Sequence, residues 1–145
     1  MMKKIIALFG ILLIYSTSSF AAGTDSSTEV IKPSSYQDML KLIKNEKYNE
    51  ALQGLEKILE QNKYKQDPDI LTHYAFVLRK TKNFKKSEEY YNKALNIDPQ
   101  HRGALEYLGE LYVDTQRSNL AKEVLKKLEN CRCQEYSELK NYINK

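Results

Sequence analysis

Glycine, proline and tryptophan are scarce in this chain, which has five Gly, three Pro and no Trp among its 145 residues. Gly and Pro form most of the irregular turns and loops in which catalytic groups are usually placed, so little such structure is available here. The sequence also has no Gly-rich phosphate loop, no nucleophile elbow, no HExxH motif and no Ser/His/Asp arrangement. These absences predict a protein that is not an enzyme and that needs no cofactor and no metal.

An excess of one charge is also missing. The formal net charge is +4, from 23 basic and 19 acidic residues that are interspersed along the chain. Nucleic-acid-binding proteins usually show a basic stripe with aromatic residues between the basic ones, and no such stripe is visible. We therefore expect no nucleic-acid partner.

Long hydrophobic runs are limited to one, from Ile5 to Tyr15, and only Gly10 interrupts it. Its 11 residues are too few for a membrane-spanning helix, which needs about 20. The run follows Lys3-Lys4 and precedes a segment of small residues that contains Ser19-Phe20-Ala21. This order is typical of a secretory signal peptide with cleavage after Ala21; an uncleaved anchor is the alternative.

The predicted signal peptide covers residues 1–21, and residues 22–35, rich in Ser and Thr, are predicted to form a flexible lead-in. Removing residues 1–21 leaves a net charge of +2. We expect an exported, soluble chain that meets a membrane only through the signal peptide before cleavage.

The rest of the chain contains a repeated helical pattern and no run that alternates with the period of a strand. One copy has the residues Leu71, Tyr74, Ala75, Leu78, Ser87, Tyr91 and Ala94, and ends at Asp98-Pro99. A copy 34 residues later has Leu105, Leu108, Gly109, Tyr112, Ala121 and Leu125, and a weaker earlier copy has Tyr48, Ala51, Leu55 and Ile58. A unit of this length cannot bury its own apolar face, so the copies must stack.

These positions resemble the signature of the tetratricopeptide repeat (TPR) family, although Ser35, Asp38, Leu128 and Cys133 depart from it. The resemblance implies an all-α, right-handed solenoid of about three helical hairpins followed by a capping helix. The implied segments are a degenerate first repeat at 36–67, a second repeat at 68–101, a third repeat at 102–133 and the capping helix at 134–145.

TPR domains bind a peptide or a helix of a partner protein in a groove, and the resemblance implies which residues face it here. They are Tyr36, Leu40, Lys44, Thr72, Phe76, Arg79, Lys80, Glu106 and Glu110. The predicted groove has a basic and an acidic patch, which suits an extended peptide, whereas mere solvation of the helix surfaces is the alternative. The Asn and Lys arrangement with which some TPR domains hold a C-terminal carboxylate is not evident. The predicted function is that of a protein-protein interaction adaptor.

Cys131 and Cys133 are the only cysteines, and their chemistry stays open at this stage. They fit a local disulfide, free thiols or an intermolecular disulfide, a thiolate site for a soft metal such as Cu(I), or a redox role. The last two would make the chain a thiol-dependent metal or redox accessory protein, which is the alternative function. His73 and His101, the only histidines, are expected in loops or on the surface.

A narrower resemblance covers the C-terminal part. The segment from His101 to Tyr112, the Cys pair, and the segment from Glu135 to Lys140 are similar to a group of exported bacterial TPR proteins. This likeness implies a periplasmic location in a Gram-negative bacterium.

Overall fold

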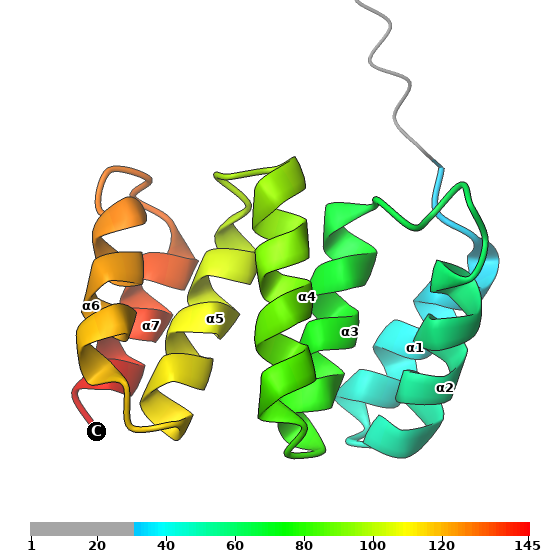
Figure 1. The fold of residues 1–145 in the computed structure, drawn as a ribbon, viewed down its shortest axis with the longest axis horizontal. Coiled ribbons are helices and arrows are strands. Elements are labelled where there is room, and N and C mark those ends of the chain that lie inside the picture. The colour runs from blue at the N-terminus through cyan, green and yellow to red at the C-terminus, as the bar shows by residue number, and fades with distance from the viewer. Residues whose placement is uncertain (1–30) are drawn as a thin grey trace, which may run out of the picture.

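The structure, a computed structural model, describes residues 31–145, and within them it contains helices and no strand (Figure 1). The helices are α1 (Ser34–Lys44), α2 (Tyr48–Leu59), α3 (Pro68–Lys80), α4 (Phe84–Ile97), α5 (Arg102–Asp114), α6 (Ser118–Lys127) and α7 (Gln134–Ile143). The predicted signal peptide lies outside the described residues, as does most of the predicted lead-in, whose last residues Ser34 and Ser35 belong to α1. Within residues 31–145 no helix combines the length and the apolar content needed to cross a membrane.

Consecutive helices pair into the hairpins α1/α2, α3/α4 and α5/α6, and the hairpins stack side by side in a row (Figure 1). The first helices of neighbouring hairpins also touch, since α3 contacts α5. α7 packs against α5 and α6 at the far end of the row from α1, in the place that the first helix of another hairpin would take. The all-α stack of helical hairpins predicted from the sequence is therefore confirmed.

The same turn joins the two helices of each hairpin. Its central residue has a left-handed backbone in all three: φ is 57° at Glu46, 66° at Lys82 and 61° at Gln116. After α3, the N–H of Lys82 donates to the carbonyl of Arg79 at 2.9 Å, and the N–H of Asn83 donates to that of Leu78 at 2.8 Å. This pairing satisfies the last carbonyls of the helix and reverses the chain direction.

The helices that begin each stacking unit differ in how they start. The Asp67 carboxylate caps α3 by accepting from the N–H groups of Asp69 and Ile70, at 3.0 and 3.1 Å. The His101 ring caps α5 by accepting at Nδ1 from the N–H of Ala104 at 3.1 Å. At the start of α7 the cap position is held by Cys133, whose side chain makes no such bond. Side-chain caps therefore fix the start of α3 and α5 but not that of α7.

Small residues let the helices approach closely, as the sequence predicts. Ala75, Ser87, Ala94, Gly109 and Ala121 are all buried. The hydroxyl of Ser87 donates to the carbonyl of Ala75 at 2.7 Å, which joins α4 to α3. A Cβ atom on Gly109 would lie only 2.5 Å from Cδ2 of the fully buried Leu139, so α5 and α7 meet closely where α5 has no side chain.

Candidate functional site

Aromatic side chains follow one face of the molecule, over α3, α5 and α7, which we call the first-helix face. The half-buried rings of Phe76 and Tyr107 lie 4.9 Å apart between centroids and join α3 to α5. The ring of Tyr48, at the start of α2, lies 6.4 Å from that of Phe76 between centroids. The exposed Lys80 places Nζ 5.2 Å from the Phe76 centroid. Such rings offer apolar contact to a ligand and attract cations to their faces.

A buried arginine holds this face together. Arg79 of α3 is only 3% exposed, and its guanidinium forms a short ion pair with Glu110 of α5. Its Nη1 atom lies 3.5 Å from Oδ2 of Asp114, and the hydroxyl of Tyr142 in α7 donates to Oδ1 of the same carboxylate at 2.7 Å. The Arg79 guanidinium also lies 5.9 Å from the Tyr142 ring. One side chain therefore links α3, α5 and α7.

Lys32, Asp69 and His101 form a second set of polar contacts at the start of α3 and α5, the Asp69 cluster. Lys32 Nζ lies 2.7 Å from Oδ2 of Asp69. His101 Nε2 lies 2.8 Å from Oδ1, and because Nδ1 of the same ring accepts from a backbone N–H, Nε2 carries the proton and donates. The hydrogen bond from His101 and the contact with Lys32 hold the pKa of Asp69 well below its usual range. Each oxygen of the Asp69 carboxylate therefore has a partner within the protein.

His73 ties the first hairpin to the second, which corrects the expectation that both histidines occupy loops or the surface. It lies in the middle of α3, and its Nδ1 lies 2.7 Å from the Tyr36 hydroxyl of α1 and 2.9 Å from the backbone carbonyl of Asp69. Because a carbonyl oxygen only accepts, Nδ1 carries the proton. Burial lowers the pKa of His73 and raises that of Tyr36, so both side chains are neutral at pH 7.

A third cluster contains carboxylates alone. We call Glu106 of α5 with Glu135 and Glu138 of α7 the carboxylate cluster. Glu106 is 4% exposed, and burial together with the hydrogen bond to Glu138 raises its pKa to about 9. Glu106 is therefore protonated at neutral pH.

The residues that the resemblance assigns to the groove lie at different depths. Tyr36, Thr72, Arg79 and Glu106 are buried, Leu40, Phe76 and Glu110 are half-buried, and Lys44 and Lys80 are exposed. The Thr72 hydroxyl donates to the carbonyl of Pro68 at 2.7 Å inside α3. The structure brings Phe76, Arg79, Lys80 and Glu110 together, whereas Tyr36 and Leu40 pack in the core between α1 and its neighbours.

Several residues of this face were not singled out from the sequence as ligand-facing, namely Tyr107, Glu135, Glu138 and Tyr142. The residues of α7 follow the last repeat, and their amphipathic pattern predicts only a capping helix. A surface pocket opens beside these residues, and its lining includes Thr72, Gly103, Tyr107 and Glu135.

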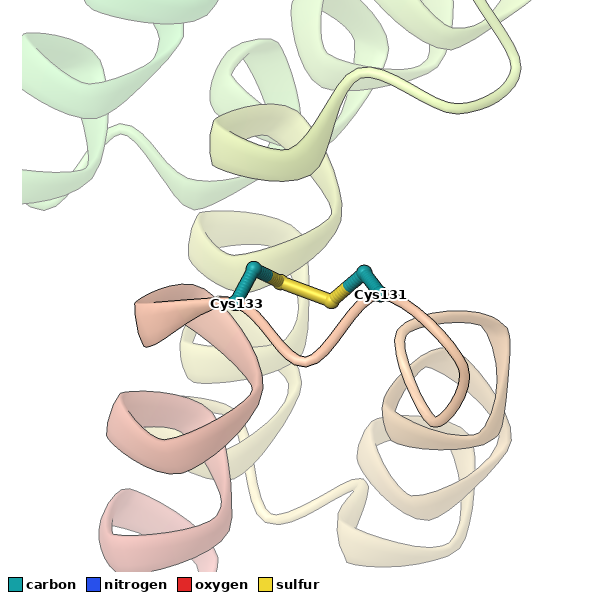
Figure 2. Close-up of a disulfide and its surroundings, with 2 residues drawn as sticks. All are labelled: Cys131 and Cys133. Atoms are coloured by element: carbon teal, nitrogen blue, oxygen red, sulfur yellow. A yellow bond between two sulfur atoms is a disulfide. The ribbon is translucent and has the colours of Figure 1, made fainter.

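Cys131 and Cys133 are joined by a disulfide, with their Cα atoms 5.1 Å apart. Figure 2 shows that the bond closes the turn between α6 and the start of α7. Within residues 31–145 no cysteine is free, and no group of three or more His, Cys, Asp or Glu side chains is arranged to hold a metal ion. Of the four alternatives for this pair, the structure shows the local disulfide.

Comparison with solved structures identifies several TPR domains with the same fold. The first TPR domain of Spaghetti (RPAP3) bound to the HSP90 peptide SRMEEVD has a TM-score of 0.64 and 23% identity over 76% of this chain and 88% of that one. The TPR2B domain of yeast Sti1 in a pHsp70 complex has a TM-score of 0.67 and 15% identity over 76% and 90%. A tetratricopeptide repeat protein from Parabacteroides merdae has a TM-score of 0.61 and 22% identity over 82% and 48%.

At the level of sequence, no curated protein matches the chain. The model of one family, described as tetratricopeptide repeat, matches residues 19–142 and so covers most of the chain. The repeated hairpins, their buried small residues and this match agree, and the protein belongs to the tetratricopeptide repeat family.

Proposed function

We propose that this protein is a non-enzymatic adaptor that binds an extended peptide or a helix of a partner protein on its first-helix face. The observation that carries the proposal is the pair of half-buried rings Phe76 and Tyr107, which crosses from one hairpin to the next beside the exposed Lys80. Rings that stay partly exposed between two helices offer a ligand apolar contact at little cost in side-chain entropy.

The similar solved structures support the same proposal. Two of them are TPR domains whose titles name an HSP90 peptide or an Hsp70 complex, so the fold is compatible with peptide recognition. The buried Arg79 is occupied by Glu110 and Asp114, and the ligand contacts are therefore assigned to the aromatic rings, Lys80 and the lining of the neighbouring pocket.

Gly103 offers a sharp test of the binding face, because it lines this pocket and a small side chain there would meet no clash. A Cβ atom at Gly103 would have its nearest neighbour, Cε1 of His101, at 3.7 Å, which is ordinary contact. A Gly103→Trp change would fill the pocket, whereas Gly103→Ala would leave it open. Peptides would be selected from a random dodecamer library on the purified protein and titrated by fluorescence anisotropy.

We expect Gly103→Trp to weaken binding of a selected peptide by at least about tenfold through steric exclusion, and Gly103→Ala to leave it nearly unchanged. Chemical-shift mapping of the bound peptide should affect α3, α5 and α7. Failure to select any peptide, or shifts confined to α2, α4 and α6, would refute the proposal.

The cellular location of the protein is a separate proposal. We propose that residues 1–21 direct export to the periplasm of a Gram-negative bacterium, on the basis of Lys3-Lys4 and the apolar run that follows. Intact-mass measurement on protein from the periplasmic fraction should give a chain that begins at Ala22. A full-length mass in the cytoplasmic fraction alone would contradict it.

A further inference from the structure

Two surface pockets of the molecule repeat with the period of the sequence. The first lies where α3 begins and α4 ends, and its lining includes Lys65, Gln66, Leu71, Lys93, Asn96 and Ile97. The second lies where α5 begins and α6 ends, and its lining includes Pro99, Gln100, Leu105, Lys127, Asn130 and Cys131. Each residue of the second set follows its counterpart in the first by 34 positions. The loops between hairpins, which supply part of both linings, lie along one edge of the row (Figure 1).

The two linings are also chemically alike. Four of the six pairs keep the residue type, namely Gln66 and Gln100, Leu71 and Leu105, Lys93 and Lys127, and Asn96 and Asn130. The two leucines are each 2% exposed and belong to the packing pattern of the repeat. The Gln, Lys and Asn side chains are exposed, and packing does not constrain such positions. Their recurrence gives both pockets the same hydrogen-bond donors above an apolar floor.

Both pockets are cationic. Lys65 and Lys93 line the first, Arg102 and Lys127 line the second, and neither lining contains a carboxylate from residues 31–145. Within the same residues only one of the four cations forms an ion pair, since Lys93 Nζ lies 2.7 Å from Oε1 of Glu89. Unpaired cations around a hollow attract an anionic ligand.

A third, smaller pocket joins the other two. It shares Asn96 with the first pocket, and Pro99 and Lys127 with the second. The volumes are about 510 Å³ for the first pocket, 730 Å³ for the second and 280 Å³ for the third. Together they form one hollow, which we call the edge groove. Among the described residues only one carboxylate lines it, that of Glu123, whereas Asp98 lines the pocket on the first-helix face.

The edge groove suits an extended chain. It runs from the end of α4 past α5 to the end of α6. Because neighbouring helices pack 8–10 Å apart, this path is roughly 20 Å long, and about six extended residues span it. Ile97, which is 44% exposed, offers such a chain an apolar contact beside the cations. Hollows with a buried floor hold side chains, whereas a flat membrane surface would reach only their rims.

We propose that the edge groove binds an extended acidic segment of a second partner protein, with one carboxylate of the segment beside Lys65, another beside Lys127 and an apolar side chain on Ile97. The complementarity of charge selects this occupant. The inference goes beyond the binding proposed for the first-helix face, because an adaptor with two separate surfaces holds two partners at once.

A pair of synthetic peptides provides the first test. The probe is a fluorescein-labelled dodecamer of four Glu-Glu-Leu repeats, and its counterpart has four Lys-Lys-Leu repeats; both are titrated on the purified protein by fluorescence anisotropy. We expect the acidic peptide to bind at least about tenfold more tightly than the basic one. No binding of the acidic peptide, or equal binding of the two, would overturn this inference and leave the function proposed for the first-helix face intact.

Charge-reversal variants then place the contact. Arg102 also lines the pocket on the first-helix face, so the changes are made at Lys65 and Lys127, which do not. We expect Lys65→Glu and Lys127→Glu each to weaken binding of the acidic peptide about threefold, and the double variant about tenfold. The control is Lys122→Glu, an exposed position of α6 outside the groove, with less than about a twofold effect. A double variant no weaker than this control would overturn the assignment.

Glu123 and anionic lipid provide two further arms. Glu123→Gln removes the carboxylate of the groove and should strengthen binding of the acidic peptide about twofold, whereas weaker binding would contradict the proposed position of the segment. Sedimentation with phosphatidylglycerol vesicles should leave the protein in solution. Co-sedimentation that is lost in the Lys65→Glu, Lys127→Glu variant would assign the groove to a membrane surface and overturn the proposal.

Discussion

The Asp69 cluster and the carboxylate cluster lie on the same set of helices and treat a carboxyl group in opposite ways. Asp69 receives a hydrogen bond from His101 and an ion pair from Lys32, and its pKa is lowered. Glu106 is buried beside other carboxyl groups, and its pKa is raised to about 9. The first arrangement stabilises the fold, whereas burial of Glu106 costs stability above the ordinary pKa of a glutamate.

This difference separates two parts of the same row of helices by the groups that surround a carboxyl side chain. The start of α3 and α5 is fixed by caps and by the Asp69 cluster. At the far end of the row, α7 packs closely on α5 at Gly109, and the disulfide closes the turn that precedes α7.

Removal of Arg79 should have the largest effect, because it would leave the half-buried Glu110 without its cationic partner. Arg79→Met leaves Glu110, whose side chain is 13% exposed, without its cation. We expect a loss of about 3 kcal/mol in the free energy of unfolding, measured by urea denaturation. Adding Glu110→Gln should restore part of the loss; a double variant no more stable than Arg79→Met alone would argue against the pair.

The second largest loss of stability should follow from a change that forces α7 away from α5. Gly109→Ala places a Cβ atom 2.5 Å from Cδ2 of Leu139, which is fully buried and has little room to move. We expect a loss of about 2 kcal/mol, since overpacking of a tight core costs 1–3 kcal/mol. Gly103→Ala in the same helix serves as the control, because its neighbours lie at 3.7 Å or more. Equal stability of the two variants in thermal unfolding would contradict the close contact.

The disulfide should contribute less, because it closes a loop of only three residues. The double change Cys131→Ser, Cys133→Ser is expected to lower the free energy of unfolding by about 1.5 kcal/mol or less. Hydrogen exchange should become faster in α7 and stay unchanged in α3, whose start depends on the Asp67 cap. Faster exchange in both helices would mean that the disulfide supports the whole stack.

Glu106 and Asp69 should also differ in how they make the free energy of unfolding depend on pH. This effect is expected to be the smallest. Between its ordinary value of 4.5 and about 9, Glu106 keeps a proton in the folded state that the unfolded chain has released, so its contribution to stability falls as the pH rises. Glu106→Gln should therefore stabilise the protein at pH 8 by at least about 1 kcal/mol, the equivalent of one pKa unit.

Asp69→Asn provides the opposite case for the same urea titrations. The stabilisation from Asp69 is present above its ordinary pKa of 3.8 and is lost as the pH falls. The variant should therefore be less stable than the parent at pH 7 and equal to it in strong acid. A Glu106→Gln variant that tracks the parent at every pH would show that Glu106 is not held protonated.

The helical hairpins could be predicted from the sequence because they depend on local spacing. Leu71, Tyr74 and Ala75 follow one helical face, and Asp98-Pro99 marks the end of the next helix. The TPR alignment also assigned Phe76 and Lys80 to one side of α3, and in the structure Lys80 Nζ lies 5.2 Å from the centroid of the Phe76 ring. Repeated local patterns were enough for this level of description.

The polar contacts could not be predicted, because each joins residues that lie far apart in the sequence. The pair His101 and Asp69 is 32 residues apart, and the pair Tyr36 and His73 is 37 apart. An alignment assigns a residue to one side of a helix but not to a depth, and Arg79, at 3% exposure, is buried by its contacts with α5 and α7. Contacts of this kind follow from the distance between stacked hairpins.

The left-handed turn found in all three hairpins has a consequence for how the protein tolerates mutation. Glu46, Lys82 and Gln116 are exposed, and surface positions of this kind usually accept almost any residue. A β-branched residue adopts a positive φ only with strain, so Val, Ile or Thr would be rejected at these three sites while Gly and Asn would be welcome. A saturation scan of the whole surface would therefore show one position in each hairpin that rejects β-branched residues, and these positions would recur with the repeat.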